Sequence, residues 1–186
     1  MLLFVGLGNP TPDSKNNRHN IGFKIIDAIN QKFSLSKQKP KFKGLLTTGN
    51  INKKKVYAIK PLTFMNNSGI CICELIEYFK INAEDVIVFH DDLDINFGKV
   101  KAKFGGSSAG HNGIESIDKF IGKDYSRIRI GIGKPKSREN TTDHVLKDFD
   151  EEEMQQLEKI TTNITDSLLI LIDRKLDLFS STVNNK

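Results

Sequence analysis

The sequence predicts a single α/β domain in which helices flank one mixed, mostly parallel, twisted sheet. Short apolar runs typical of buried strands alternate with segments in which apolar residues recur every third or fourth position. A basic turn around Lys53 separates two further strands and makes them an antiparallel pair. The length of 186 residues suits one domain, so we expect residues 1–186 to fold as a unit.

The first half of the chain supplies the first strands and two helices. Residues 1–6 are apolar and indicate a buried strand, and residues 43–61 indicate the two strands of the hairpin. Helical spacing of apolar residues predicts a helix with Ile21, Ile25, Ile29 and Phe33, and a second helix, beginning near Ser68, with Ile72, Leu75, Ile76 and Phe79.

The second half continues the alternation. Residues 85–94 indicate an apolar strand that ends in acidic residues, and residues 98–110 a strand followed by a glycine-rich loop. In residues 125–133 isoleucines alternate with arginine and glycine, which predicts a strand with one apolar and one polar face. Helical spacing predicts a helix with Ile114, Ile117 and Ile121, and a long amphipathic helix over 150–172 with Met154, Leu157, Ile160, Ile164, Leu168 and Leu171. We expect the tail, residues 180–186, to be loose.

Charge and hydropathy narrow the class of protein. The 28 Lys and Arg against 23 Asp and Glu give a net charge of +5, which favours a polyanionic partner, although a solvated surface can carry the same excess. The sequence shows no charged leader followed by an apolar stretch and a cleavage site, and no run approaches the ~18 apolar residues of a membrane span. We therefore expect a cytoplasmic protein without a membrane partner.

The glycine-rich segments do not complete a phosphate-binding motif. Gly6 and Gly8 begin a G-x-G-x-x-G pattern, but Thr11 stands where the third glycine is needed. The loop that ends at Gly110 is followed by His111 and lacks the Lys-Ser/Thr of a P-loop. We expect the glycines instead to allow tight turns at strand ends.

Polar clusters follow several predicted strands, where open α/β sheets commonly bind ligands. The clusters are Asn9 with His19, Asn66 in "TFMNNSG", His90 with Asp91 and Asp92, and His111 with Asn112. A histidine beside a carboxylate can activate water, because its pKa lies near neutrality and the carboxylate fixes its tautomer. Other interpretations of these clusters are that each histidine is a hydrogen-bonded surface residue, that the asparagines form turns, or that "HDDLD" binds a metal. From the residues alone, a hydrolytic cleft and a binding cleft both stay open.

Five motifs in order, "GLGNP…RHNIGF", "KPLTFMNNSG", "HDDLD", "GGSSAGHNGIESI" and "RIRIGIGKP", resemble the bacterial peptidyl-tRNA hydrolase family over nearly the whole chain. The resemblance implies a monomeric α/β hydrolase that cleaves the ester between a peptide and the 3′ ribose of tRNA, and so recycles tRNA from stalled or aborted translation. It implies no metal and no cofactor.

The resemblance also implies roles for individual residues. His19 matches the general base, Asp91 the carboxylate that orients it, and Asn9 the residue that recognises the peptide bond and spares aminoacyl-tRNA. The substrate-binding and tRNA-binding positions that it implies are Ser14, Phe64, Met65, Asn66, Asn112, His111, Lys101, Lys103 and Arg129.

One departure concerns the segment between Asn-Pro and Arg-His. The family has Gly-x-x-Tyr-x-x-Thr there, whereas this chain has Thr11, Ser14 and Asn17, so Ser14 replaces an aromatic contact to the substrate. Two alternative functions remain at this point. The chain is either a relative that kept an RNA-binding cleft but lost turnover, or a metal-dependent phosphohydrolase built on "HDDLD".

Overall fold

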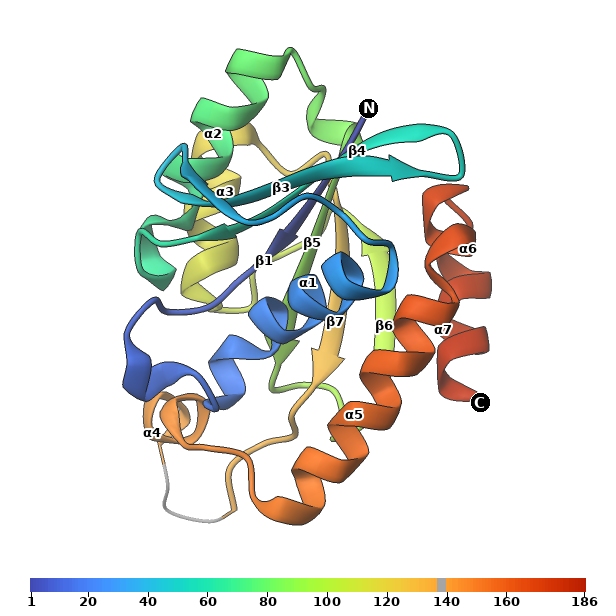
Figure 1. Cartoon of the computed structure of the whole chain (residues 1–186). Helices are drawn as coiled ribbons and strands as arrows, with labels where there is room; N and C mark the ends of the chain where they lie inside the picture. The colour runs from blue at the N-terminus through green and yellow to red at the C-terminus, as the bar shows by residue number, and fades with distance from the viewer. Residues whose placement is uncertain (137–139) are drawn as a thin grey trace.

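The computed structural model describes residues 1–136 and 140–186 (Figure 1). The strands are β1 (Leu2–Gly6), β2 (Lys39–Lys41), β3 (Gly44–Ile51), β4 (Lys54–Pro61), β5 (Val86–Asp92), β6 (Val100–Phe104) and β7 (Ser126–Gly131). The α-helices are α1 (Ile21–Lys32), α2 (Ser68–Phe79), α3 (Asn112–Ile121), α4 (Thr141–Leu146), α5 (Glu151–Asp166), α6 (Leu168–Ile172) and α7 (Leu176–Asn184). Short 3-10 turns are η1 (Pro12–Ser14), η2 (Arg18–Asn20), η3 (Met65–Asn67) and η4 (Ala83–Asp85).

The described strands form one seven-stranded mixed sheet in the order β2-β3-β4-β1-β5-β7-β6. β1 lies between β4 and β5 and is parallel to both, and β5 is parallel to β7. The β2–β3, β3–β4 and β6–β7 pairs are antiparallel. The expected α/β class, the mixed sheet and the hairpin at Lys53 are confirmed. The described strands are not mostly parallel, however, because the parallel and antiparallel pairs are equal in number. β2, which the sequence analysis did not predict, is a short exposed edge strand.

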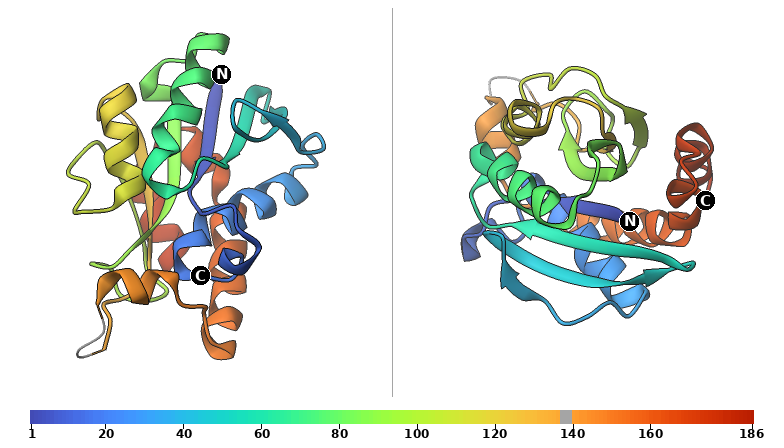
Figure 2. Two further views of the ribbon diagram at one scale, coloured as in Figure 1. Left: turned by 90° about the vertical axis from the view of Figure 1, so that its left-hand side faces the viewer. Right: turned by 90° about the horizontal axis from the view of Figure 1, so that it is seen from above.

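Helices cover both faces of the sheet, as Figure 2 shows from two directions. One apolar core lies beneath α1, α5, α6 and α7, and includes Phe4, Ile25 and Leu157. The other lies beneath α2 and α3, and includes Val5 and Ile72. No helix of the described residues is both long enough and apolar enough to cross a membrane.

Glycine at the end of β1 permits a close approach rather than the tight turn that we expected. A Cβ atom at Gly6 would lie 2.2 Å from the carbonyl oxygen of Gly22 in α1. A Cβ atom at Gly22 would in turn lie 2.3 Å from the backbone nitrogen of Leu7. Because neither contact is possible for a real Cβ, both glycines are needed to seat α1, and the segment just before it, against β1.

The predicted long helix over 150–172 is divided at Ser167. α5 ends at Asp166, α6 begins at Leu168, and Ser167 is only 2% exposed. The predicted apolar positions still face the core: Leu157, Ile160, Ile164, Leu168 and Leu171 are buried, and Met154 packs against the cluster. Apolar residues of both segments therefore remain in the same core.

The expectation that residues 180–186 form a loose tail is wrong, because α7 extends to Asn184. Its residues Phe179 and Val183 are buried against the core. The side-chain amide of Asn184 exchanges two hydrogen bonds with the backbone of Val100, at 2.9 and 2.8 Å, and Ser180 Oγ accepts from the N–H of Ala102 at 2.8 Å. These side chains satisfy the free edge of β6, which would otherwise be exposed to pairing with another chain.

We predict that Phe179→Ala lowers the free energy of unfolding by about 3–5 kcal/mol, because it removes a fully buried ring and leaves a cavity. Leu178→Ala, a 50% exposed neighbour on the same helix, is the matched control and should change stability by less than about 1 kcal/mol. Urea unfolding of both variants measures the difference. Equal losses for the two would show that α7 does not dock on the sheet as described.

Candidate active site

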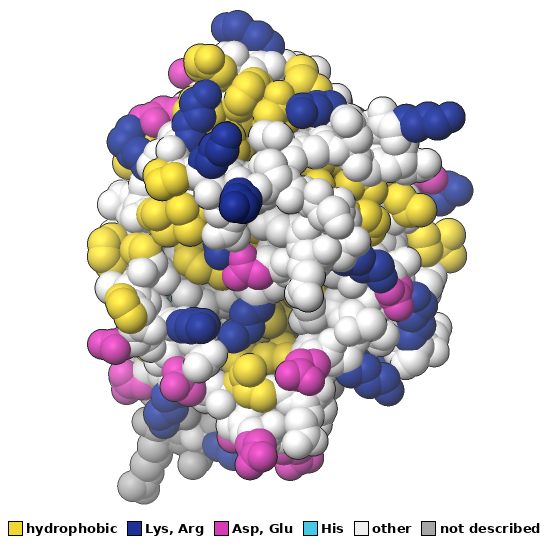
Figure 3. Space-filling model, in the orientation of Figure 1, with side chains coloured by type: hydrophobic (Ala, Val, Ile, Leu, Met, Phe, Trp, Pro, Cys, Tyr) yellow, Lys and Arg dark blue, Asp and Glu magenta, His cyan; other side chains and the backbone are white. Residues whose placement is uncertain are grey.

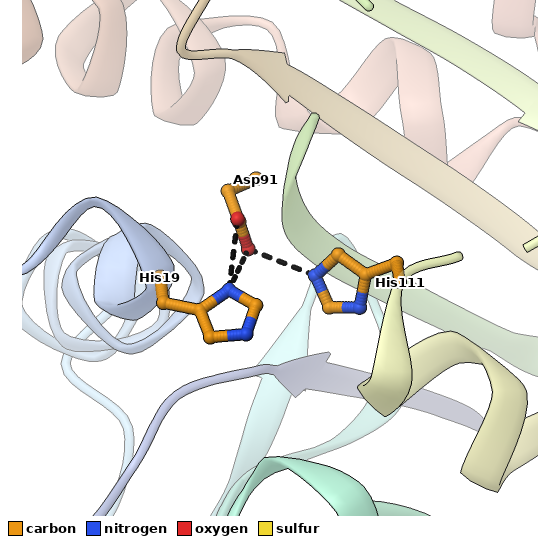
Figure 4. Close-up of side chains that lie close together, drawn as sticks. All are labelled: His19, Asp91 and His111. Atoms are coloured by element: carbon orange, nitrogen blue, oxygen red, sulfur yellow. Dashed lines mark hydrogen bonds and ion pairs between the residues drawn. The ribbon is translucent and has the colours of Figure 1, made fainter. Parts of the chain in front are cut away.

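Three side chains from separate parts of the chain meet at the carboxyl end of β5 (Figure 4). His19 comes from η2, Asp91 from the end of β5, and His111 from the residue that precedes α3. His19 Nδ1 lies 2.8 and 2.9 Å from the two carboxylate oxygens of Asp91, and His111 Nε2 lies 2.9 Å from Asp91 Oδ1. Asp91 therefore joins two histidines that are 92 positions apart in the sequence.

The hydrogen bonds assign opposite tautomers to the two histidines. His111 Nδ1 accepts from the backbone N–H groups of Gly113 and Ile114, so the ring proton must be on Nε2, which donates to Asp91. His19 donates to Asp91 through Nδ1, and its other ring nitrogen, Nε2, points away from the carboxylate (Figure 4). His19 Nε2 is therefore the atom whose lone pair is available as a base.

Charge and burial set the protonation of the pair. Burial by itself would lower the pKa of His19, but the charge of Asp91 and its hydrogen bond together outweigh burial, and the pKa is raised above its ordinary value. Burial would raise the pKa of Asp91, yet the two histidines hold it well below the usual carboxyl range. Asp91 is 1% exposed and stays ionised, so it can stabilise a positive charge that develops on His19.

A pocket of about 220 Å³ opens beside these residues. Its walls combine the histidine–aspartate group with the loop before α3 and with one side of α4. The predicted site residues among its lining are His19, Asp91, His111 and Asn112, and the lining from α4 is Thr141, Thr142 and Val145.

Asn9 is held in one orientation by two neighbours. Its side-chain Oδ1 accepts from the backbone N–H of Met65 at 2.9 Å, and its backbone exchanges two hydrogen bonds of 2.9 Å with the Asn20 side chain. No acceptor for Asn9 Nδ2 is found in residues 1–136 and 140–186. Because the oxygen is already used, the amide presents a fixed N–H donor.

Phe64, Met65 and Asn66 follow β4 in a strained turn. Phe64 has φ of 60°, a conformation that L residues rarely adopt, and the residue is 52% exposed. Met65 is buried, and its sulfur lies 2.5 Å from where a Cβ atom at Gly113 would stand, so this glycine lets α3 approach the turn. Asn66 lines a second pocket, which shares Asn112 with the first.

The "HDDLD" motif does not converge on one metal. Asp92 forms an ion pair of 2.7 Å with Arg129, and His90 Nδ1 lies 2.8 Å from the Asp91 carbonyl oxygen. Burial lowers the pKa of His90 to about 3, so it stays neutral. Among the residues described, the one group close enough to hold a cation is His19, Asp91 and His111, within 4.8 Å. Its His111 nitrogen carries the proton donated to Asp91, which argues against a ligand role there.

The predicted tRNA-binding residues lie on one face of β6 and β7. Lys101 and Lys103 stand opposite Arg129 and Arg127 across the antiparallel pair. The charges of Arg129 and Arg127 are compensated by Asp92 and Asp118, whereas neither lysine has an ion-pair partner in the described part of the chain. Burial, and the two arginines, lower the pKa of Lys103. The lysines therefore supply the uncompensated charge of this face.

The face of β7 that we predicted to be polar is not exposed at Arg127, which is 1% exposed. Its guanidinium donates to Asp118 on α3 and to the carbonyl oxygen of Ser107 in the glycine-rich loop, both at 2.8 Å. Arg127 thus ties the loop that leads to His111 down to the sheet.

Figure 3 shows basic and acidic side chains interspersed on another face of the molecule, where no histidine is visible.

Ser14, like Asn9, Phe64 and Met65, does not line the pocket that holds His19 and Asp91. It is 9% exposed, and its hydroxyl lies 2.7 Å from that of Thr11. It lines neither of the two pockets described, so its role in substrate binding stays a prediction.

The sequence did not predict the contacts that hold the segment just before His19. Arg18 donates to both carboxylate oxygens of Glu153, at 3.2 and 2.9 Å, and to the carbonyl oxygens of Lys147 and Asp148. Asn17 Nδ2 donates to Asp148 Oδ1 at 2.7 Å. These contacts join the residues just before His19 to the segment between α4 and α5 and to the first turn of α5. The partners are about 130 positions away, and no periodic pattern signals such a contact.

A mixed α/β sheet with a histidine–aspartate pair at the carboxyl end of a central strand, beside a pocket, defines a candidate hydrolase. Comparison with known proteins makes the class specific. The peptidyl-tRNA hydrolase family model matches residues 3–186, and the chain belongs to this family.

Relatives support the assignment over the full length. The chain is 86% identical to a peptidyl-tRNA hydrolase of Pelagibacter ubique, with all of both chains covered. It is 45% identical to that of Bartonella henselae, covering 99% of this chain and 95% of the relative. The crystal structure of peptidyl-tRNA hydrolase from Acinetobacter baumannii superposes with a TM-score of 0.92 at 33% identity, covering 99% of this chain and 94% of that one.

We predict that two substitutions of His111 separate its two hydrogen-bonding tasks. His111→Asn keeps an oxygen that can cap α3 but loses the bond to Asp91, whereas His111→Ala loses both. Both should slow hydrolysis to a similar extent and lower stability, because Asp91 loses one of its two donors, while His111→Ala should lose about 1 kcal/mol more than His111→Asn. Thermal unfolding and turnover measure the two effects. Parental turnover in His111→Asn would contradict the tie to Asp91.

Proposed function

We propose that this protein hydrolyses the ester that joins a peptide to the 3′ ribose of tRNA, and so releases tRNA from stalled or aborted translation. One observation carries the proposal: His19 has its Nδ1 engaged by a buried, ionised Asp91 and its Nε2 free beside a pocket. This is the arrangement that a general base for water requires. Family membership supplies the substrate class.

In the proposed reaction, His19 Nε2 takes a proton from water while the water oxygen attacks the ester carbonyl carbon. The carbonyl π electrons move to oxygen, and side-chain amides at the site are suited to stabilise this oxyanion. Collapse of the intermediate breaks the bond to the ribose oxygen, which receives the proton back from His19. Asp91 holds the imidazole in place and stabilises its transient positive charge without taking the proton.

Selectivity against aminoacyl-tRNA follows from the same amides. A peptidyl substrate presents a neutral amide next to the ester, whereas an aminoacyl group presents a charged amine. The proposed role of Asn9 and Asn66 is to pair with that amide, and Phe64 and Met65 would wall the peptide side. A charged amine cannot form the same hydrogen bonds as an amide, so it would leave hydrogen-bonding groups of these side chains without a partner.

The chain has the other features that this function needs. Lys101 and Lys103 offer charge for tRNA phosphates, with Arg129 beside them, and phosphate contacts of this kind position a nucleic acid without reading its sequence. One copy of the chain supplies every group that the proposed reaction uses, which supports action as a monomer. The proposed substrate arises from translation, which supports a cytoplasmic location.

The test of the function compares purified protein on peptidyl-tRNA and on aminoacyl-tRNA, with and without chelator. We expect rapid release from peptidyl-tRNA, little from aminoacyl-tRNA, and no effect of the chelator. His19→Ala should lower turnover by at least the ~10²-fold typical of losing a general base, with tRNA binding retained. Binding without turnover in the parent would indicate an idle RNA-binding relative, and loss of activity in chelator a metal-dependent enzyme.

The pH dependence tests the role of Asp91. Because the base must be neutral and the pKa of His19 is raised, kcat/KM should rise as pH increases through that raised pKa. Asp91→Asn removes the charge that raises it, so the acidic limb of the profile should move to lower pH. The plateau should fall as well, by about 10²-fold, since an amide oxygen cannot replace the carboxylate charge. An acidic limb that does not move would remove Asp91 from the mechanism.

We predict that the double variant Lys101→Ala/Lys103→Ala weakens binding of full-length peptidyl-tRNA without slowing the hydrolysis of a minimal peptidyl-adenosine ester. Each lost phosphate contact should reduce the salt slope of binding by up to about one unit. Lys37→Ala/Lys39→Ala, exposed at the opposite edge of the sheet, is the matched control. An unchanged salt slope in the first variant would exclude this phosphate contact.

A further inference from the structure

The residues that lead to His19 lie against a distant segment of the chain. Residues 16–18 run antiparallel to residues 147–149, with an isolated bridge between Asn17 and Asp148. One backbone N–H of each segment donates to a carbonyl oxygen of the other, at 3.0 and 3.1 Å. The backbone that carries the base is therefore paired, although it lies outside the seven-stranded sheet.

The Arg18 side chain adds to this pairing. Its Nη1 donates to the carbonyl oxygen of Asp148 at 3.0 Å, and its Nη2 forms an ion pair of 2.9 Å with Glu153. The guanidinium carbon lies 5.5 Å from the ring centroid of Phe149, a buried residue of the core beneath α5. The side chains of the ion pair are only 11% and 21% exposed, so salt and water screen it less than an exposed pair.

Glu153 is held independently of Arg18. Its Oε2 accepts from the backbone N–H of Asp150 at 2.9 Å, and its own N–H donates to Asp150 Oδ1 at 2.8 Å. These two bonds form the capping box that begins α5, and α5 packs against α1. The carboxylate is therefore a fixed point to which the guanidinium binds.

The same contacts reach one wall of the active-site pocket. Residues 147–149 follow α4 directly, and three residues of α4 line the pocket. α4 also packs against η2, the turn that contains His19 (Figure 1). A displacement of Arg18 would therefore act on two parts of the site, the base that follows it in the chain and the wall that faces the base.

We propose that Arg18 and Glu153 act as a positioning pair, which aligns His19 with Asp91 and fixes the α4 wall of the pocket relative to them. Neither Arg18 nor Glu153 lines either of the two pockets described, so the pair acts through the residues that do. The proposal rests on the proposed function, because it assigns the pair to the same reaction. The competing explanation is direct charge, since Arg18 places a cation next to the base in the chain.

The alignment of His19 can be read from its titration. Its pKa is raised because the charge of Asp91 and the hydrogen bond to it outweigh burial. Both contributions weaken as the ring moves away from the carboxylate, so a looser His19 should have a lower pKa. The substitutions below leave the other titratable groups around η2 in place: His111, whose ring centroid is 4.9 Å from that of His19, Lys24 on α1, and Asp143 and His144 on α4.

Two variants with opposite changes of charge separate positioning from direct charge. Arg18→Met removes the cation and its hydrogen bonds, and Glu153→Gln removes the anion but keeps an oxygen for the capping box. If the pair positions His19, both variants should lower the pKa of His19 and move the acidic limb of kcat/KM to lower pH. Direct charge would move the limb in opposite directions, because loss of a cation raises the pKa of a histidine and loss of an anion lowers it.

The experiment combines a ¹H–¹⁵N NMR titration of the His19 ring with turnover of peptidyl-tRNA. Arg18→Met should lower kcat/KM by about 10-fold, through a lower kcat from the misaligned base and a higher KM from the displaced wall. Glu153→Gln should change both in the same direction but less, because its amide oxygen can still accept one bond. Arg174→Met is the matched control: it breaks an exposed ion pair with Asp85, which precedes β5 at the end opposite Asp91, and should change neither readout.

Thermal unfolding checks that each variant is folded at the assay temperature. If Arg18→Met does not fold, Arg18→Lys replaces it, because Lys keeps the charge but cannot form the same set of bonds. Positioning then predicts a lower pKa of His19, whereas direct charge predicts no change. Shifts of opposite sign in the two charge variants, or a His19 pKa unchanged in both, would overturn the proposal. A parent protein that does not hydrolyse peptidyl-tRNA would overturn the proposed function, while the NMR titration would still decide whether the pair aligns His19.

Discussion

The buried carboxylate of Asp91 is the interaction on which the site depends. It lies at the end of β5, 1% exposed, and receives one N–H from His19 and one from His111. An unpaired buried carboxylate would be strongly unfavourable, so the two histidines must stay in place for Asp91 to remain ionised. The charge that makes His19 a better base is thus maintained by a second histidine, which takes no part in the proposed proton transfer.

Each of the two histidines is held by a different part of the fold. The close packing of Gly6 against Gly22 places the start of α1, just after His19, beside β1. The Arg18–Glu153 ion pair holds the residue that precedes His19. His111 is fixed because its Nδ1 caps α3, which Arg127 ties to β7 through Asp118. Contacts from the beginning, middle and end of the chain therefore converge on one carboxylate. This convergence explains how two histidines that precede helices are both held against a carboxylate at the end of a strand.

The sequence predicted the parts of this structure that depend on local pattern. The alternation of strands and helices gave the α/β class, and the rule that ligands bind at strand ends brought His19, Asp91 and His111 to one edge of the sheet. It could not predict the tautomer of His111, since that depends on two backbone N–H groups of α3. Nor could it predict that Arg127 is buried, because alternation along a strand does not show what covers the polar face.

The C-terminal helix α7 shows why the sequence prediction of a loose tail failed. The last seven residues, "SSTVNNK", are polar enough to suggest a loose tail. Phe179 and Val183, four positions apart, nevertheless place two buried side chains on one face, and Ser180 and Asn184 bond the edge of β6. The polar residues have a structural task there. Composition alone could not reveal it, because the partner is a strand edge rather than an apolar surface.

The most direct test of this account is the tautomeric state of the two histidines, measured by long-range ¹H–¹⁵N NMR of the imidazole rings at a pH where both are neutral. The account predicts that His19 carries its proton on Nδ1 and His111 on Nε2, with the His19 signal changing on Asp91→Asn. A His19 ring protonated on Nε2 would contradict it, because the lone pair that must accept the proton of water would then face Asp91 instead of the pocket.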